Sequence, residues 1–410
     1  MSGYTGRVVC PNCQTETSGA AIFAGCSRCA ADGSPVNVHP EFDIEIDVRP
    51  DVSAPGIFRH RRLLPLPEGI DPVSLEEGNT PLLRLSRLGT SVGLANLYLK
   101  DESRNPTWSY KDRLAAVAVT RARADGADTV VVGTTGNHGA AAAAYAAAAG
   151  LRCVVLTLTS VPLTMKVLMQ VYGAEVVAVS DSADRWTVMR EAVGLRGWVP
   201  LSGLTDPPVG SNPYGIEGYK TIAYELVEQL SECPDIVVVP VAYGDGLIGI
   251  HRGFQELLCL GKISHLPRLV AAEPLGPYWA TLQSGSTTPQ RVGGGTSVAF
   301  SVASTVATAQ GVRALRESDG TAVVVGDDAE ILDAQRRLAS AGCYLEPSAA
   351  ICLPAVERLV ARKLVSREAV VVMIGTSGGL KDIEATAATL PQVPLIEPNL
   401  AALEEALVTQ

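Results

Sequence analysis

Short apolar runs that alternate with helical patterns constrain the fold of this chain more than any other feature. Most residues of these runs are valine, isoleucine, leucine or alanine, as in strands covered on both faces. The stretches between the runs have the periodicity of helices. Alternation of strand and helix predicts parallel sheets with right-handed crossovers, and therefore an α/β fold. The predicted strands are Asn96–Leu99, Thr129–Val132, Cys153–Leu158, Glu175–Ala178, Ile236–Val241, Leu269–Ala272, Ala322–Val325 and Ala369–Ile374. The predicted helices include Thr164–Tyr172, Gly218–Leu230, Gly249–Leu258, Asp327–Ala341 and Ala349–Lys363.

Four cysteines near the amino terminus have the spacing of a metal site. Cys10 and Cys13 form one Cys-x2-Cys pair, and Cys26 and Cys29 form another after twelve intervening residues. Two such pairs can close a tetrahedral sulfur site, as in a zinc ribbon. With four protein ligands no coordination position stays open, so the Zn²⁺ would be structural. The alternative is a pair of disulfides, which a reducing cytosol disfavours.

Composition and charge argue against several classes of function. Apolar residues make up 47% and charged residues 19% of the chain, as in a globular protein. The net charge of -10 argues against nucleic acid and anionic membranes as main partners. Residues 1–7 lack the apolar core of a signal peptide, and the alanine-rich run 139–150 is too short to span a bilayer. We therefore expect a soluble cytoplasmic protein that acts on a small molecule.

The segment Asn105–Arg113 places Lys111 just inside a predicted helix start. Pro106 cannot donate a backbone hydrogen bond, and Ser109 is a good N-cap residue. A lysine in the first turn lies at the positive end of the helix dipole, which together with burial lowers its pKa. A neutral amine is what a covalent bond with an aldehyde cofactor requires. The alternative is a surface lysine on an ordinary helix, the commoner case for an isolated lysine.

Glycine-rich loops follow three predicted strands, where ligands bind in open parallel sheets. The first, Gly133–Gly139, offers backbone amides and the side chain of Asn137 to an anion. An ordinary strand-to-helix turn would have the same composition, and His138 alone fits a structural histidine better than a catalytic base. Another, Gly375–Asp382, offers a hydroxyl and then glycines that allow close approach. Glu346, at a predicted helix entry, could face the same site or complement the helix dipole.

The remaining loop, Gly244–Gly249, has the spacing Gly-x-Gly-x-x-Gly between a predicted strand and a predicted helix. Glu273 ends the next strand, at roughly the distance along the chain expected of a ribose-binding acid. Taken alone, the loop slightly favours a nicotinamide or flavin dinucleotide. The alternative is that the same backbone cradles a single phosphate group.

Together these segments resemble the fold type II pyridoxal-phosphate enzymes, and among them the threonine synthases. The likeness runs in order from about Gly78 to about Asp382, and a zinc ribbon precedes the same body in some relatives. The matching segments are Glu77–Leu82, Asn105–Arg113, Gly136–Asn137, Asn212–Tyr214, Glu217–Gly218, Lys220–Thr221, Pro240–Gly246, Glu346–Ser348, Thr376 and Gly379–Asp382. The resemblance implies two open parallel α/β domains of the tryptophan synthase β type, with pyridoxal 5'-phosphate in the cleft between them.

The resemblance also implies roles for the matching residues. Lys111 would bind the cofactor covalently and then act as acid and base, and Asn137 would hydrogen-bond the ring hydroxyl. Thr376 would face the ring nitrogen, where a hydroxyl in place of a carboxylate favours elimination over transamination. The backbone that would hold the cofactor phosphate belongs to Gly244, Asp245, Gly246 and Leu247. The substrate would contact Thr134, Thr135 and Ser109, with its carboxylate at the helix start.

Three domains and a linker are expected from the 410 residues. Residues 1–40 would form the zinc ribbon, and residues 41–95 a linker and the start of the large domain. A smaller α/β domain over residues 96–205 would carry Lys111 and Asn137. A larger one over residues 206–400 would carry the phosphate loop and Thr376. By family habit we expect a homodimer.

Several positions depart from the pattern typical of threonine synthases. The departures are Trp108, Gly215, Tyr219, Val161–Pro162, Tyr243 and Asp245. Gly215 stands where relatives often have an arginine, and Val161–Pro162 stand where they usually have a Gly-Lys pair. Those basic groups would pair with a phosphorylated substrate. The bulky Trp108 predicts a reshaped or smaller pocket. We predict a pyridoxal-phosphate-dependent lyase, of the type that converts O-phosphohomoserine to threonine. The alternatives are a β-elimination or β-replacement enzyme on serine, threonine or an O-activated serine, a dinucleotide oxidoreductase, and a non-catalytic zinc-ribbon protein.

Overall fold

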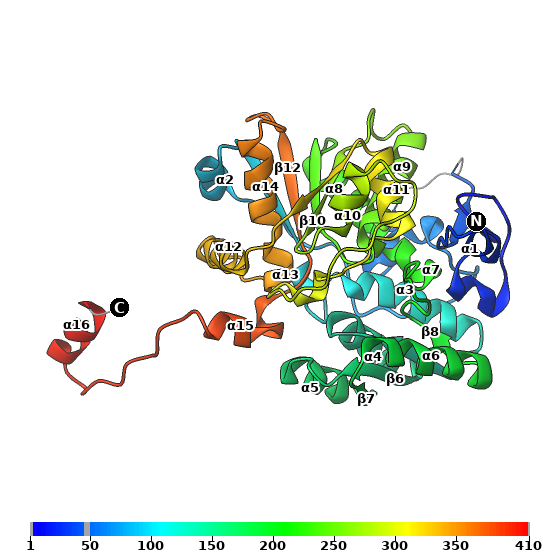
Figure 1. Cartoon of the computed structure of the whole chain (residues 1–410), viewed down its shortest axis with the longest axis horizontal. Helices are drawn as coiled ribbons and strands as arrows, with labels where there is room; N and C mark the ends of the chain where they lie inside the picture. Colours follow the sequence, from blue (N-terminus) through cyan, green and yellow to red (C-terminus); the bar gives the residue numbers. More distant parts are fainter. Residues whose placement is uncertain (1–2, 45–49, 409–410) are drawn as a thin grey trace.

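The body of the protein contains two sheets, each with its own set of helices (Figure 1). The computed structural model describes residues 3–44 and 50–408. The larger sheet has the strand order β11-β10-β9-β12-β4-β3, with every neighbouring pair parallel except β3 and β4. The smaller sheet has the order β7-β6-β5-β8 and is parallel throughout. The predicted α/β class with two open parallel sheets is therefore confirmed.

All eight strands predicted from the apolar runs are present. The larger sheet consists of β3 (Leu82–Arg84), β4 (Asn96–Asp101), β9 (Ile236–Pro240), β10 (Arg268–Glu273), β11 (Thr321–Val324) and β12 (Val370–Gly375). The smaller sheet consists of β5 (Thr129–Gly133), β6 (Arg152–Leu158), β7 (Glu175–Val179) and β8 (Val199–Pro200). The helices of the body are α2 (Ser86–Val92), α3 (Lys111–Ala124), α4 (Asn137–Ala149), α5 (Leu163–Val171), α6 (Ser182–Arg196), α7 (Pro213–Ile216), α8 (Lys220–Leu230), α9 (Asp245–Cys259), α10 (Pro277–Gln283), α11 (Ala309–Glu317), α12 (Asp328–Ser340), α13 (Pro347–Ala350), α14 (Cys352–Ala361), α15 (Ile383–Ala387) and α16 (Leu400–Val408).

Alternate residues of the central strands face two different cores. Val237 and Val239 of β9 pack in a core shared with α3, α4, α8 and α9. Ile236 and Val238 of the same strand pack on the other face, with α12 and α14. The first core also contains Val130 and other residues of the smaller sheet, so one continuous apolar cluster joins the two halves of the body. In the described ranges, no helix is both long and apolar enough to cross a membrane.

The structure corrects two predicted boundaries. Strand β4 belongs to the larger sheet, where residues 96–101 pair with residues 370–375 of β12, so the smaller domain cannot begin at residue 96. The segment predicted as a linker is partly core, because Ile57, Phe58 and Leu64 have no exposed surface. Residues 45–49 of that prediction lie outside the described residues.

The amino-terminal segment forms a small unit of β1 (Tyr4–Val9), α1 (Ser27–Ala31) and β2 (His39–Phe42). Its two strands pair antiparallel, so the unit extends a little beyond the predicted end at residue 40. The Nδ2 atom of Asn37 ties it to the body by donating to the Ser211 carbonyl at 3.1 Å and to Gln310 Oε1 at 3.3 Å. The amino-terminal unit therefore contacts the part of the body next to the Gly244–Gly249 loop.

A buried charged cluster anchors α3. Arg113 donates to Glu102 from Nε at 2.7 Å and to Glu225 from Nη1 at 2.6 Å, and all three side chains are almost fully buried. Lys100 completes the cluster with Nζ 2.6 Å from Glu225 Oε2. Two cations balance two carboxylates, so the cluster is electrically neutral. It fixes the helix that begins with Lys111 against β4 and α8.

Candidate active site

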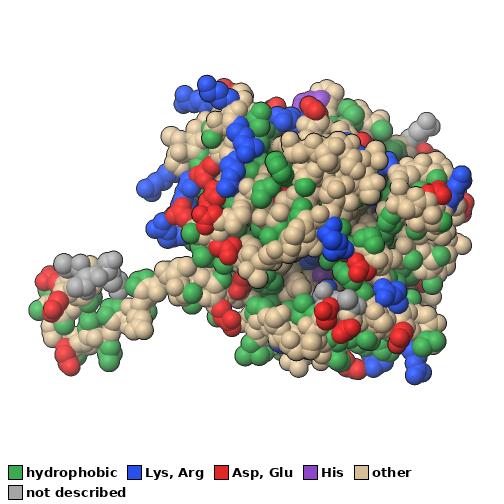
Figure 2. All heavy atoms as spheres, viewed as in Figure 1, with side chains coloured by type: hydrophobic (Ala, Val, Ile, Leu, Met, Phe, Trp, Pro, Cys, Tyr) green, Lys and Arg blue, Asp and Glu red, His purple; other side chains and the backbone are tan. Residues whose placement is uncertain are grey.

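A cavity of about 420 Å³ lies where the carboxyl ends of both sheets meet. Its wall includes residues of all three predicted loops, among them Thr134, Gly244 and Thr376, together with Lys111. Figure 2 shows the hollow between the two halves of the body, with a histidine inside it. Parallel sheets bring the loops at their carboxyl ends together, which explains why loops more than two hundred residues apart in sequence share one site.

Lys111 is the first residue of α3 and reaches this cavity. Its Nζ lies 5.1 Å from the ring centre of Tyr110 and 5.8 Å from that of Tyr219. Burial lowers the pKa of the Lys111 amine, and the more distant charges of Asp245 and Glu346 oppose this only in part. No ion pair holds Lys111 within the described part of the chain. The amine therefore favours its neutral, nucleophilic form.

Ser109 does not play the predicted N-cap role. Tyr110 is the N-cap residue of α3, and no side chain caps the helix among the described residues. Ser109 is fully buried, its Oγ has no hydrogen-bond partner in residues 3–44 or 50–408, and the described cavity wall does not include it. The turn is held instead by Asp112, whose carboxylate accepts the Thr107 N–H at 2.9 Å and the Thr107 hydroxyl at 2.6 Å.

Asn137 connects the two halves of the site. Its Nδ2 donates to Glu346 Oε1 at 3.0 Å and Oε2 at 3.1 Å, and Ser377 Oγ donates to its Oδ1 at 3.2 Å. Burial raises the pKa of the Glu346 carboxyl, an effect that the hydrogen bond from Asn137 opposes. Glu346 therefore faces the site, one of the two roles left open by the sequence.

The Gly133–Gly139 loop presents backbone amides at the start of α4. The Thr134 hydroxyl accepts the N–H groups of Gly136 at 3.0 Å and Gly139 at 3.2 Å, so it shapes the loop. Gly136 has φ +152°, and a Cβ there would lie 2.9 Å from the Met165 sulfur. Apart from the Gly139 N–H that Thr134 accepts, no described side chain caps α4, so the N–H groups of Asn137 and the half-buried Thr135 are available to an anion.

The Gly244–Leu247 loop likewise forms an open helix start. Gly244 is the N-cap residue of α9 with φ +73°, and within the described residues no side chain caps the helix. The Asp245 carboxylate, a poor neighbour for an anion, is turned away from the amides. It accepts the Ser211 N–H at 2.9 Å, the Ser211 hydroxyl at 2.6 Å and Gln310 Nε2 at 2.7 Å. A 15-residue helix with uncapped amides is a suitable site for a phosphate group.

Glu273 is not available to a ribose. Its carboxylate accepts the N–H groups of Tyr278 at 3.0 Å and Trp279 at 2.7 Å, and so it caps α10. The structure therefore removes the feature that favoured a dinucleotide. The interpretation that remains is that Gly244–Leu247 binds a single phosphate group.

Thr376 follows β12 and lines the cavity with only 5% of its surface exposed. Its carbonyl accepts the Tyr110 N–H at 2.9 Å, and Ser377 forms a bridge with Ser109. The residue beside Lys111 is thus hydrogen-bonded directly to the loop that carries Thr376.

The departures from the family pattern have structural causes. Trp108 has φ +59°, a left-handed conformation that favours glycine, and its side chain is 48% exposed. It is absent from the described cavity wall, so the prediction that it narrows the pocket is wrong. A Cβ at Gly215 would lie 2.8 Å from Leu114 Cγ, so no arginine fits there while α7 packs against α3. The ring of Tyr219, another of the departures, lies beside the Lys111 amine.

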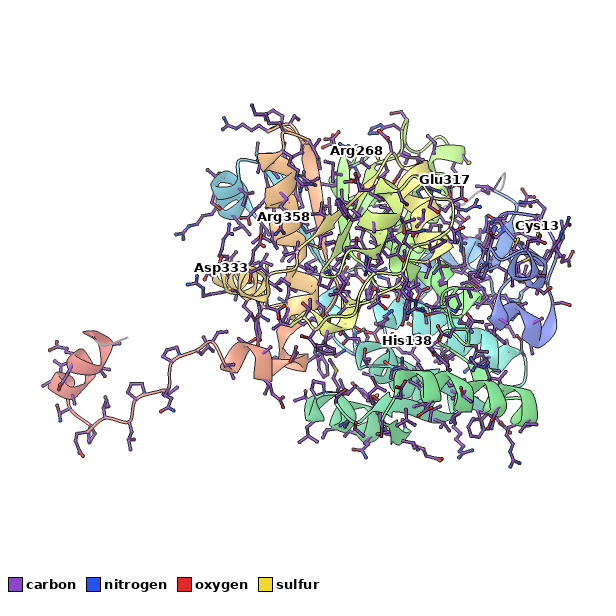
Figure 3. All side chains as sticks on the ribbon, viewed as in Figure 1. Cys13, His138, Arg268, Glu317, Asp333 and Arg358 are labelled. Atoms are coloured by element: carbon purple, nitrogen blue, oxygen red, sulfur yellow. The ribbon has the colours of Figure 1, made fainter. Side chains whose placement is uncertain are left out.

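Two further residues line the cavity: His138, for which the sequence favoured a structural role, and Arg185, which lies in no predicted motif. His138 faces the cavity with a buried Nε2 that lacks a partner in the described residues (Figure 3). Burial holds the pKa of His138 well below its usual range, so its imidazole is neutral. Arg185 of α6 also lines the cavity. Its helix was not among those predicted, and only the tertiary fold brings it to the site.

The four predicted ligand cysteines lie together in the amino-terminal unit. All four sulfurs are within 4.8 Å of one another, and the closest pairs, Cys10 with Cys29 and Cys13 with Cys26, are 3.6 Å apart. Sulfurs bound tetrahedrally to zinc at about 2.3 Å lie roughly 3.8 Å from each other, whereas a disulfide requires about 2.05 Å. The arrangement fits a metal and contradicts the disulfide alternative.

Comparison with known proteins agrees with this geometry. Residues 73–377 match the family model described as "Pyridoxal-phosphate dependent enzyme", and the chain belongs to that family. It is similar to the threonine synthase of Methanosarcina acetivorans, with 32% identity over 97% of this chain and 98% of that protein. The threonine synthase of Mycobacterium tuberculosis is 31% identical over 86% of this chain and 96% of its own length.

Solved structures share the fold. Maize serine racemase superposes with a TM-score of 0.64 and 24% identity, over 76% of this chain and 91% of that one. Diaminopropionate ammonia lyase from Escherichia coli superposes with a TM-score of 0.64 and 19% identity, over 77% of this chain and 88% of that one. The fold type II class predicted from the motifs is therefore confirmed.

Proposed function

We propose that this protein converts O-phosphohomoserine and water to threonine and phosphate. The observation that carries the proposal is the half-buried Lys111 amine, which has no ion-pair partner in the described residues and shares one cavity with the open start of α9. The identity of 32% to a threonine synthase over 97% of the chain supports the same conclusion.

The residues of the cavity suit pyridoxal 5'-phosphate. When bound, this cofactor supplies an electron-withdrawing ring that stabilises negative charge at the substrate Cα. The Lys111 amine would hold it covalently, and the amides of Gly244–Leu247 would bind its phosphate. Asn137 would donate to the ring hydroxyl, and the uncharged Thr376 hydroxyl would leave the ring nitrogen without a proton.

Substrate binding would use the other helix start. The N–H groups of Thr135 and Asn137 would receive the α-carboxylate, a role that needs no charged side chain. The Lys111 amine, whose pKa is lowered by desolvation, would take the Cα proton and return it later in the reaction. The cavity between the two halves would exclude water until a hydroxyl is added.

A second candidate is β-elimination or β-replacement on serine, threonine or an O-activated serine. It is favoured by Gly215, where the packing of α7 against α3 leaves no room for an arginine that would bind a substrate phosphate. The two candidates share the cofactor and Lys111, and they differ in the substrate that is turned over.

The first test is the absorption spectrum of the purified protein with added pyridoxal phosphate. A visible band, lost in Lys111→Ala and kept in Lys166→Ala, would establish the lysine. Lys166 is a suitable control because it lies on α5 with Nζ 2.7 Å from the Thr159 carbonyl, away from the cofactor loops. Release of phosphate with threonine from O-phosphohomoserine supports the first candidate. Turnover of serine or O-phosphoserine alone selects the second, and a protein without the band refutes both.

We further propose that Cys10, Cys13, Cys26 and Cys29 bind a structural Zn²⁺, and that the enzyme is a cytoplasmic homodimer. Supporting the zinc are four sulfur ligands at tetrahedral spacing. Elemental analysis should find one zinc per chain, which Cys26→Ser should lose. Light scattering should give twice the mass of 42.9 kDa, and a monomeric mass would refute the dimer.

A further inference from the structure

Arg185 is a buried cation without a partner. It lies in the first turns of α6 with 5% of its surface exposed, and it lines the cavity. Its Nε and Nη1 atoms are buried and donate to no acceptor in the residues that the structure describes. No described carboxylate forms an ion pair with it. Its guanidinium therefore has hydrogen-bond donors and a charge that the protein itself does not satisfy.

The neighbouring arginines differ from Arg185. Arg291, also in the cavity wall, lies 3.6 Å from the carboxylate of Asp206 and is 61% exposed. Arg190, one turn further along α6, donates to the Leu204 carbonyl at 3.1 Å and to Thr187 Oγ1 at 3.1 Å. Of the two arginines in the described cavity wall, Arg185 is therefore the one that lacks an acceptor among the described residues.

Burying such a group costs free energy. Removing a guanidinium from water without a counter-ion costs several kcal/mol. Burial lowers the pKa of Arg185, with Tyr243 opposing, but arginine keeps its charge at neutral pH. Among the described residues, the Trp186 ring, whose centre is 5.7 Å from Arg185 Cζ, offers a further cation–π contact. Unpaired buried cations of this kind are found where an anionic ligand completes them.

The position of Arg185 is fixed beside the substrate loop. A Cβ added at Gly133 would lie 3.2 Å from Arg185 Cδ, so the arginine stem packs on the residue that begins the Gly133–Gly139 loop. The α-carboxylate is proposed to bind one to four residues further along this loop. A substrate held there would have its side chain within the cavity that Arg185 also lines.

We propose that Arg185 binds the anionic group at the far end of the substrate side chain, and that this group is a phosphate ester. A guanidinium with free N–H groups fits phosphate oxygens in a bidentate manner. Arg185 would supply from α6 the positive charge that α7 cannot carry at Gly215. The inference rests on the proposed function, because that function places the amino-acid end of the substrate at Thr134–Asn137.

The test compares Arg185→Met with Arg190→Met in the pyridoxal-phosphate-loaded enzyme. Loss of a charged hydrogen bond predicts a fall in kcat/KM for O-phosphohomoserine of roughly 10- to 100-fold in Arg185→Met. Inorganic phosphate, titrated calorimetrically into the same enzyme, should bind more weakly by a similar factor. Arg190→Met should change neither value.

Two further readouts separate the proposal from other roles of Arg185. The affinity for pyridoxal phosphate should be unchanged in Arg185→Met, and a large loss would assign the arginine to the cofactor phosphate and overturn the proposal. The melting temperature of the substrate-free enzyme should stay equal or rise, because an unpaired charge is removed. A lower melting temperature with unchanged phosphate binding would show a structural role. Failure to take up pyridoxal phosphate at all would refute the proposed function instead.

Discussion

Replacing Arg113 by methionine tests how the buried cluster holds α3. The variant keeps the length of the side chain but removes its hydrogen bonds to Glu102 and Glu225. Lys100 would then face two buried carboxylates as the only cation of the cluster. Breaking a buried ion pair by removing one partner costs about 3–5 kcal/mol, and we expect the free energy of unfolding at neutral pH to fall by that amount.

The loss should depend on pH. Burial raises the pKa of Glu102 and of Glu225, but Arg113 outweighs it and holds both below their usual range. Carboxyls with a lowered pKa stabilise the protein above the unfolded pKa, and the stabilisation is lost as the pH falls. In Arg113→Met a carboxyl left without its cation would take up a proton instead. The difference in the free energy of unfolding between wild type and variant should therefore shrink as the pH falls below 4.5, the pKa of a glutamate in the unfolded chain.

Urea unfolding at neutral pH and near pH 4 would measure both effects. Arg104→Met is the matched control, because Arg104 pairs with Asp101 at 3.0 Å but is 66% exposed. An exposed pair contributes about 1 kcal/mol or less. A loss in Arg113→Met no larger than in the control, or a loss independent of pH, would refute the reasoning.

Three further substitutions test other features. Trp108→Gly should stabilise the protein by about 1 kcal/mol, because glycine removes the strain at φ +59°; an unchanged urea midpoint would contradict this. Asn37→Ala should weaken cofactor binding several-fold. Asn37 donates to Gln310, and Gln310 donates to the Asp245 carboxylate, which keeps that carboxylate away from the backbone amides of the phosphate loop. Titration of the cofactor into the apo-protein measures the change in affinity. Burial raises the pKa of Glu77 from 4.5 to about 7. Between these two pH values the folded state keeps a proton that the unfolded state releases. The free energy of unfolding should therefore fall by on the order of 3 kcal/mol as the pH rises through this range. Glu77→Gln should abolish that fall, and equal pH profiles for the two proteins would argue against a protonated Glu77.

Local patterns in the sequence predicted the strands well. All eight apolar runs became strands, and most of them are buried as their composition predicts, although β7 (Glu175–Val179) is largely exposed. Strands β3 and β8, of three and two residues, are too short to show any periodicity. The place of β4 could not be predicted, because its pairing with β12 joins residues about 270 positions apart and no local pattern specifies a partner.

Some residues of the site could likewise be predicted from local motifs, whereas others depend on the tertiary fold. Lys111, Asn137 and the two helix starts lie in motifs whose spacing follows from backbone geometry, and the structure brings them to one cavity. The burial of Arg185 and the partners of Glu346 depend on how the two sheets face each other. The N-cap role expected of Ser109 failed for a local reason, since the helix begins one residue later than a serine cap would require.

The pairing of β12 also has a consequence for synthesis. β12 lies between β9 and β4 in the middle of the larger sheet, yet it is the last strand to be made. Until residue 375 has left the ribosome, β9 and β4 each expose an apolar edge that only β12 can cover. Unpaired edges of this kind promote aggregation. A nascent chain therefore carries an unfinished sheet for most of its translation, and truncated products should depend on chaperones for solubility.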